Sequence, residues 1–187
     1  MTDTGLTGTE MALLRVLLDK EAIRDVLNRY CRAMDRCDAE LLQDVFHDDA
    51  REDHGGLHEG SAREFCSLAI DYVRKMGVVV HYLSNVTINV TGESAVAESY
   101  GIALHRIDGE DGSFDSVFGA RLLDRFEKRQ GVWRIIHRRV VYDWNRDAPV
   151  AESWGRGFFA GQPQGGSKDR NDPSYTLFPT RARSGPA

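Results

Sequence analysis

The first third of the chain places its hydrophobic residues with the period of an α-helix. Apolar side chains recur along one stripe of residues 13–34, which predicts an amphipathic helix that ends near Asp35. A shorter helix is predicted over residues 39–46, because its apolar side chains gather on one side and Asp38 can serve as its N-cap. Two consecutive amphipathic helices therefore open the fold.

The next segment changes from a polar stretch to a third helical stripe. Residues 47–60 (HDDAREDHGGLHEG) are mostly polar or charged and contain glycine, and we interpret them as a loop. Ser61 and Glu64 have the spacing of a capping box. The apolar stripe that follows predicts a third helix, which Gly77 stops.

From residue 78 onward the pattern becomes alternating and rich in β-branched residues, which is typical of strands. Short separators that contain glycine, TGES, DGEDGS and RQG, divide it in the way that hairpin connections do. The predicted strands are residues 78–90, 95–107, 116–129 and 132–144. Because helices and strands are segregated, we predict an α+β domain in which a curved antiparallel sheet wraps around N-terminal helices to form a cone.

The composition is that of one ordinary globular domain with terminal extensions. The 187 residues are 41% hydrophobic and 28% charged, and a chain of this length can bury a core without metal ions or disulfides. We divide it into a flexible lead over residues 1–10, the domain over residues 11–145 and a tail over residues 146–187. The tail is rich in Gly, Pro and Arg, and it wraps the domain or a neighbour or is partly disordered.

Charge and cysteine content limit the partners and the compartment. The chain carries 24 Lys and Arg against 29 Asp and Glu, a net charge of −5, which argues against nucleic acid as a partner. Its 3 cysteines form no C-x-x-C pair, as expected of reduced thiols in a cytosol. Neither a signal peptide nor an apolar run long enough to span a membrane is visible, so we expect a cytoplasmic protein without membrane contact.

The candidate chemistry centres on one histidine. His81 lies in the middle of the most apolar predicted strand, where an unpaired imidazole would be costly to bury. Asp35, at the end of the first predicted helix, could accept the imidazole N–H, fix its tautomer and leave the other nitrogen free as a base. The alternative is a structural pair, in which a core histidine is hydrogen-bonded to an aspartate at a helix end.

Four segments together resemble the SnoaL-like branch of the NTF2-like superfamily. They are NRYCRAMDRCD, LLQDVFHDDAREDHGGLHEG, VVVHYLSNVTINV and GVWRIIHRRVVYDW. The resemblance covers residues 11–145 and implies an NTF2-like (cystatin-like) cone. Members of this branch include scytalone dehydratase, hexachlorocyclohexane dehydrochlorinase and the bile-acid 7α-dehydratase. In such lyases, the resemblance implies, a strand histidine is the base and a helix-end aspartate orients it, and His81 and Asp35 fall on those positions.

The same resemblance implies further site residues on the first helix and the last strand. Tyr30 matches a tyrosine that points at the substrate, although it could equally be a core aromatic of the helix stripe. Arg138 matches a pocket arginine that would polarise the substrate; if it faces a subunit contact instead, Arg139 or neither is the functional residue. Strand alternation places Val140 and Tyr142 on the same face as Arg138, so we include both as substrate-binding residues.

The histidines of the 47–60 segment have two interpretations. His54 matches a substrate-facing position that holds a tyrosine in the related dehydratase, so we include it as a substrate-binding residue. His54 and His58 could also form a metal site with nearby carboxylates, but a loop does not present two histidines on one face as a helix does, and we expect no metal. The other histidines are interpreted as solvated or edge residues: His47, His105 and His137.

No dinucleotide, phosphate-loop or serine-hydrolase motif occurs, which leaves proton transfer without a cofactor. The sequence therefore predicts a cofactor-independent lyase (a dehydratase) or isomerase that acts on a hydrophobic ring-bearing substrate, such as a steroid-like, polyketide-like or aromatic compound. Two alternatives stay open: the non-catalytic small subunit of a ring-hydroxylating dioxygenase, and a small-ligand binding protein of the same fold. By analogy of fold we expect a homo-oligomer, a trimer or a dimer.

Overall fold

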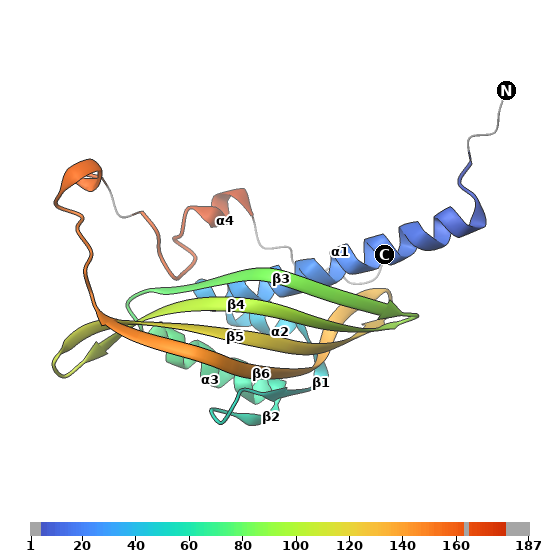
Figure 1. Ribbon diagram of the computed structural model, residues 1–187, viewed down its shortest axis with the longest axis horizontal. Helices are drawn as coiled ribbons and strands as arrows, with labels where there is room; N and C mark the ends of the chain where they lie inside the picture. Colours follow the sequence, from blue (N-terminus) through green and yellow to red (C-terminus); the bar gives the residue numbers. More distant parts are fainter. Residues whose placement is uncertain (1–4, 163–164, 179–187) are drawn as a thin grey trace.

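The chain folds into helices packed on one side of a curved sheet (Figure 1). The computed structural model describes residues 5–162 and 165–178, so parts of the predicted lead (1–4) and tail (163–164 and 179–187) lie outside the described residues. The main helices are α1 (Gly8–Asp35), α2 (Ala39–Asp44) and α3 (Ala62–Arg74). The tail adds a short 3-10 turn, η1 (Gly157–Phe159), and one helical turn, α4 (Ser174–Leu177). This arrangement confirms the predicted α+β class.

The helix starts follow from local capping. Thr7 and Glu10 form a capping box at the start of α1. Asp38 caps α2, as predicted, and accepts the backbone N–H of Leu41 at 3.1 Å. Ser61 caps α3 in the same way. The predicted end of the second helix was wrong by two residues, because the chain leaves the helix after Asp44 and enters a strand.

Four long strands form the antiparallel meander that the alternating pattern predicts. They are β3 (Val79–Thr91), β4 (Ser94–Gly109), β5 (Gly112–Arg129) and β6 (Val132–Pro149). Each strand pairs with the next along the chain, and the last one extends past the predicted domain boundary at residue 145. The hairpins are local, which explains why the sequence pattern alone defines them.

The interpretation of residues 47–60 as a loop was wrong. They contribute most of β1 (Phe46–Asp53) and most of β2 (Glu59–Ser61), joined by a short turn. The strand β1 pairs in parallel with β6, so the sheet is mixed and has the order β2-β1-β6-β5-β4-β3. Phe46 is buried at the start of β1, but the other buried positions are His47, Ala50 and Glu52 rather than large apolar residues, so the strand carries almost no hydrophobic signal.

Irregular pairing bends the sheet around the helices. The register shifts between Leu83 and Val86 on β3, and again between Gly119 and Ala120 on β5. Such bulges increase the local twist and bend the strand. At the second bulge the Trp144 indole lies over Gly119, where any side chain would collide with it. The bend gives the sheet a concave face turned toward the helices.

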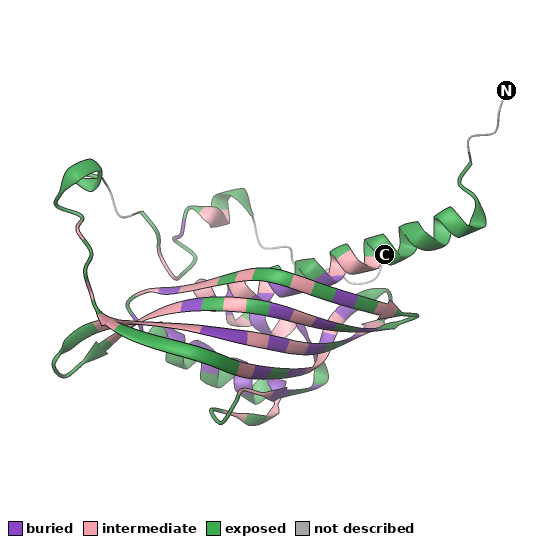
Figure 2. Ribbon diagram, in the orientation of Figure 1, coloured by how far each residue is buried: buried purple, intermediate pink, exposed green. Residues whose placement is uncertain are grey.

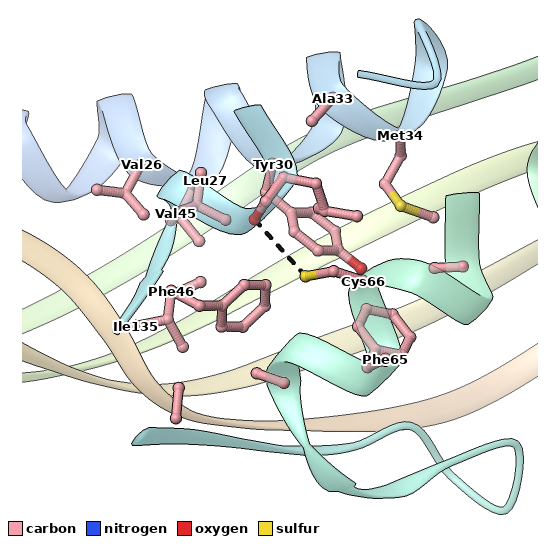
Figure 3. Close-up of a cluster of buried hydrophobic side chains, with 14 of the residues drawn as sticks. Val26, Leu27, Tyr30, Ala33, Met34, Val45, Phe46, Phe65, Cys66 and Ile135 are labelled. Carbon is pink, nitrogen blue, oxygen red and sulfur yellow. Dashed lines mark hydrogen bonds between the residues drawn. The ribbon is translucent and has the colours of Figure 1, made fainter. Parts of the chain in front are cut away.

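Burial separates a main core from a smaller apolar patch. The main core lies between the helices and the sheet, where Tyr30, Phe46 and Phe65 pack together with aliphatic side chains (Figure 3). The patch consists of Ala120, Leu122 and Val140, with Leu83 packed against it. Figure 2 shows that α1 is exposed along its N-terminal half, which projects past the sheet. None of the described helices is long and apolar enough to cross a membrane.

The described part of the tail returns to the helix ends. The ammonium group of Lys168 donates to the backbone carbonyl of Val73 at 2.8 Å, near the end of α3. The Tyr175 hydroxyl donates to the capping carboxylate of Asp38 at 2.9 Å. Residues 168–178 therefore lie against the corner between α1 and α2, which is the corner that positions Asp35.

Candidate active site

A helix stop places Asp35 at the edge of the concave face. The helix α1 ends in a Schellman-type motif, in which the N–H of Asp38 bonds to the carbonyl of Ala33 at 2.9 Å and the N–H of Cys37 bonds to the carbonyl of Met34 at 3.3 Å. The motif needs a left-handed residue, and Cys37 supplies it with φ 50°. The last helical residue is thus fixed in position.

The carboxylate of Asp35 meets the imidazole of His81 on β3. His81 Nδ1 donates to Asp35 Oδ1 at 2.7 Å, and the backbone N–H of His81 donates to Oδ2 at 3.3 Å. Because a carboxylate only accepts hydrogen bonds, the contact fixes the proton on Nδ1 and leaves Nε2 unprotonated in the neutral ring. Each side chain is 17% exposed. The structure therefore brings together the pair expected from the sequence and leaves it within reach of a ligand.

The position of Asp35 is unfavourable for the helix itself. Carboxylates near a helix C-terminus oppose the helix dipole, typically by about 0.3–1 kcal/mol. The charge is compensated locally by the hydrogen bonds from His81 rather than by the helix. Asp35 therefore destabilises the end of α1 while it contacts His81, and this combination fits a role in orienting the imidazole.

A line of rings extends from His81 across the concave face, and we call it the ring arc. Its members are His81, His105, Phe118, Tyr142, His54 and Phe65. Successive ring centroids are 4.5–6.1 Å apart. Sheet register places His81 opposite Ala103 and Ala103 opposite Phe118, so these side chains share one face. The arc joins α3, the β1–β2 turn and all four long strands into one surface.

His54 belongs to a second carboxylate–imidazole pair. Its Nδ1 lies 2.8 Å from Glu52 Oε1, and its ring stacks on Phe65. The Glu52 side chain is fully buried, and burial raises the pKa of its carboxyl, although the hydrogen bond from His54 opposes that rise. His54 lies on the ring arc beside Tyr142, and its contact with substrate stays a prediction.

Arg138 faces inward and Arg139 faces outward. The Arg138 guanidinium is fully buried and holds Asp124 through two hydrogen bonds of 2.7 and 2.8 Å. Burial alone would lower the pKa of Arg138, but the charge and hydrogen bonds of Asp124 outweigh it and the pKa is raised. Arg139 is 63% exposed and pairs with Asp53. Of the two arginines, only Arg138 can act from the concave face.

Tyr30 lies in the core rather than at an open surface. It is 3% exposed, and the Arg138 guanidinium carbon lies 4.0 Å from its ring centre. Burial raises the pKa of its phenol, so the group stays protonated. These contacts favour the interpretation of Tyr30 as a core aromatic that supports Arg138, and a direct contact with substrate stays a prediction.

Four buried polar atoms of the concave face have no hydrogen-bond partner among the described residues. They are Glu52 Oε2, Arg138 Nη1, His105 Nε2 and Ser99 Oγ. Buried polar atoms are normally paired, so each calls for an explanation, such as a water molecule or a ligand. Three of them lie beside the apolar patch to which Val140 belongs: Ser99 is opposite Leu122, Arg138 is two residues from Val140 on β6, and Glu52 is opposite Arg138. An apolar floor with a few polar groups is the usual composition of a small-molecule site.

A hollow of about 620 Å³ lies elsewhere, between the α1–α2 corner and the tail. Its lining is mostly charged and includes Arg36, Glu40, Lys168 and Arg170, but neither Asp35 nor His81.

The second histidine of the metal alternative, His58, bonds to the carbonyl of Ser61 at 3.1 Å rather than to the Glu52 pair. Among the described residues, no cluster of three or more acidic, histidine or cysteine side chains could hold a metal ion.

Two of the other histidines differ from their expected places. His105 is partly buried in the ring arc rather than solvated, and His47 is buried and lies 2.9 Å from the carbonyl of Glu127. The predictions missed Glu52, Asp124 and Phe118 as well. A signal existed for His105 and Phe118, because both occupy alternating positions that share the face of His81. No such sequence signal existed for Glu52, because the strand that carries it was not recognised.

We expect His105 to make folding stability depend on acid pH. Burial, and then the charges of His81 and His54, lower the pKa of His105 to about 4. In the unfolded chain the imidazole is protonated near pH 6.5, whereas in the folded protein it is protonated only near pH 4. The free energy of unfolding therefore falls as the pH drops from about 6.5 to about 4. His105→Gln should remove about 3 kcal/mol of the loss between pH 6.5 and 4, as measured by urea unfolding. Parallel curves for both proteins would contradict this expectation.

Comparison with known families and proteins adds to this picture. The sequence model of the SnoaL-like domain family matches residues 15–139, which is well over half of the chain. No curated protein matches the chain in sequence. The family match covers α1 from residue 15 onward, α2, α3 and the sheet as far as the middle of β6, so it includes every member of the two carboxylate–imidazole pairs.

Solved structures give the same fold at low sequence identity. Hexachlorocyclohexane dehydrochlorinase LinA-type3 from Novosphingobium barchaimii is 17% identical with a TM-score of 0.66, over 75% of this chain and 99% of that one. A protein provisionally named scytalone dehydratase, from Novosphingobium aromaticivorans, is 22% identical with a TM-score of 0.63, over 75% and 96%. An NTF2-like protein with a cystatin-like fold from the same organism is 23% identical with a TM-score of 0.59, over 74% and 90%. At these identities the likeness shows the fold alone.

Proposed function

We propose, from the premise that the chain belongs to the SnoaL-like domain family, that it is a cofactor-independent lyase. The reaction would be the elimination of water or halide from a ring-bearing ketone, with His81 as the general base and Asp35 as the group that orients it. The observation that carries the proposal is the 2.7 Å contact between His81 Nδ1 and Asp35 Oδ1. Structural relatives that bear dehydratase and dehydrochlorinase names support this class of reaction.

The proposed step begins at His81 Nε2. This nitrogen has no hydrogen bond among the described residues, and the ring is held in the tautomer that makes it a base. It would take a proton from the carbon next to a carbonyl group. The imidazolium that forms is stabilised by the Asp35 carboxylate, whose role matches that of the aspartate in other carboxylate–histidine pairs. The electron pair then forms the new double bond as the leaving group departs.

The neighbours of His81 support an apolar substrate. The rows of the concave face next to it carry Ala103, Phe118 and Ala120, which are small or aromatic. Small side chains at such positions leave room over the sheet, and aromatic rings stack on flat ligands. A ring-bearing ketone combines an acidic C–H bond with a flat apolar body, so it fits both features.

The experiment is a search for turnover with a defined panel. Purified protein is incubated with β-hydroxy and β-chloro cycloalkanones, from 3-hydroxycyclohexanone to fused-ring homologues, and the conjugated enone is followed by ultraviolet absorbance. We expect enone formation above the background rate, with solvent deuterium entering recovered substrate if proton removal is reversible. Binding of these ketones without any product or exchange would instead favour the binding-protein alternative and contradict the lyase proposal.

A further inference from the structure

The concave face holds two carboxylate–imidazole pairs in different environments. The Asp35 carboxylate of the first pair is 17% exposed, whereas the Glu52 carboxylate of the second pair is 0% exposed. Solvent can stabilise the charge of Asp35 while His81 is neutral. Solvent does not reach Glu52, and a buried carboxylate needs a compensating proton or positive charge. Environments that differ in this way separate acid roles from base roles within one site.

The buried cluster around Glu52 is balanced only when His54 and Glu52 share one additional proton. Arg138 is the neighbour of Glu52 across the β1–β6 pair, but its charge is already matched by Asp124 through two hydrogen bonds. The remaining charge of Glu52 is neutralised if His54 is an imidazolium, or if Glu52 itself holds the proton. Either distribution leaves a proton on the Glu52–His54 pair that is available for transfer.

Two unpartnered atoms next to this pair point to the chemistry of a ligand. Glu52 Oε2 is a buried acceptor and Arg138 Nη1 is a buried donor, and neither has a partner among the described residues. Their residues occupy register partners on β1 and β6. A hydroxyl group both donates and accepts hydrogen bonds, so it can satisfy an acceptor and a donor together. While Glu52 is ionised, a carbonyl oxygen could satisfy only the arginine.

One line of rings joins the two pairs. His105 lies 5.3 Å from His81 between ring centroids, and burial, followed by the charges of His81 and His54, lowers the pKa of His105. Phe118 and Tyr142 complete the line between the pairs, with centroids 5.5 Å apart. A flat ring-bearing substrate that lies along these rings would contact the surface that joins the two imidazoles.

We propose that Glu52 and His54 form a second proton-transfer site, at which the leaving hydroxyl group of the substrate is bound and protonated. This inference rests on the proposed lyase function and names its substrate class: a ring-bearing β-hydroxy ketone. His81 takes the proton from carbon, the C–H electron pair becomes the C=C bond, the C–O bond breaks, and the proton of the Glu52–His54 pair joins the departing oxygen as water. His81 then holds one proton more and the second pair one less, and exchange with solvent water restores both.

The test compares two leaving groups. A hydroxyl group needs a proton to leave, whereas chloride does not, so a general acid matters only for the first. His54→Gln should lower kcat for the β-hydroxy ketone by about 10²-fold and for the matching β-chloro ketone by less than about 3-fold. His81→Gln should lower both rates. The control is His58→Gln, a histidine of the same turn, and both of its rates should stay within about twofold of wild type.

Equal losses for the two leaving groups in His54→Gln, or no loss with either, would overturn this inference while leaving the role of His81 intact. Binding gives a readout that does not need turnover. By calorimetry or ligand-observed NMR, wild-type protein should bind 3-hydroxycyclohexanone at least about tenfold more tightly than cyclohexanone, because the hydroxyl group pairs the buried donor and acceptor. His54→Gln should reduce that preference. Equal affinities for the two probes in the wild-type protein would also overturn it, whether or not the protein is a lyase.

Discussion

Replacing His81 with glutamine is expected to lower kcat for elimination by about 10²- to 10⁴-fold without unfolding the protein. Glutamine can still donate a hydrogen bond to Asp35, so the contact between α1 and β3 survives. It cannot accept a proton from carbon at neutral pH, so only the base is removed. The rate is measured on whichever ketone of the panel the wild-type protein converts fastest, and circular dichroism checks the fold.

Two companion variants separate the base from its surroundings. Asp35→Asn keeps the shape of the pair but removes the charge that stabilises the imidazolium, and a loss of kcat of similar order is expected. His137→Gln replaces a histidine on the opposite face of β6, next to Arg138 in sequence, and should leave kcat within about twofold. Turnover by His81→Gln close to the wild-type rate would remove His81 from the mechanism. An unchanged rate in Asp35→Asn would reduce that residue to a structural cap.

Replacing Arg138 with leucine is expected to cost about 3–5 kcal/mol of folding stability, more than the loss of any exposed ion pair of the sheet. The Arg138 and Asp124 side chains are both 0% exposed, so the substitution leaves a buried carboxylate without its partner. It also removes the guanidinium that packs 4.0 Å from the Tyr30 ring centre. The free energy of unfolding is measured with urea at neutral pH.

The adjacent arginine is a matched control. Arg139 lies next to Arg138 on β6 and forms an exposed ion pair with Asp53 of β1. Arg139→Leu removes this pair, and such pairs contribute about 0–1 kcal/mol. The double variant Arg138→Leu with Asp124→Leu should regain much of the lost stability, because an apolar pair can replace a buried ion pair of similar volume. A loss in Arg138→Leu no larger than in Arg139→Leu would show that Asp124 is not held as a charged partner in the folded protein.

Local patterns predicted most of the fold. The three helices, the capping role of Asp38 and the four-stranded meander all depend on interactions between residues close in sequence. Periodicity and capping chemistry report such interactions directly. The family resemblance added the way in which these elements are arranged in space, and the match to the SnoaL-like domain confirms it.

The strand β1 could not be predicted because nothing in its composition resembles a strand. Its sequence, FHDDARED, pairs with β6 from a distant part of the chain, and its buried polar residues depend on that pairing. Glu52 is buried because Arg138 and His54 surround it in the folded protein. Long-range partners of this kind override local propensity, and a single sequence does not reveal them.

The candidate site was predictable in its first pair and not in its second. His81 and Asp35 stood out because one is polar within an apolar strand and the other lies at a helix end. The Glu52–His54 pair lies in the segment interpreted as a loop, so its burial went unrecognised. Strand alternation put Arg138 and Arg139 on opposite faces of the last strand but left open which of them faces inward. It also gave no sign of Asp124, the partner of Arg138 on the neighbouring strand.

The parallel pairing of β1 with β6 has a consequence for the order of folding. The hairpins from β3 to β6 close short loops, whereas the β1–β6 ladder joins segments separated by α3 and three long strands. Loop closure of that length is slower and entropically less favourable, so this ladder should assemble after the meander. The Asp35–His81 contact needs only α1 and β3. A late folding intermediate would therefore contain the Asp35–His81 contact before Glu52 and His54 are in place. A chain trapped during folding would lose the Glu52–His54 pair before the Asp35–His81 pair.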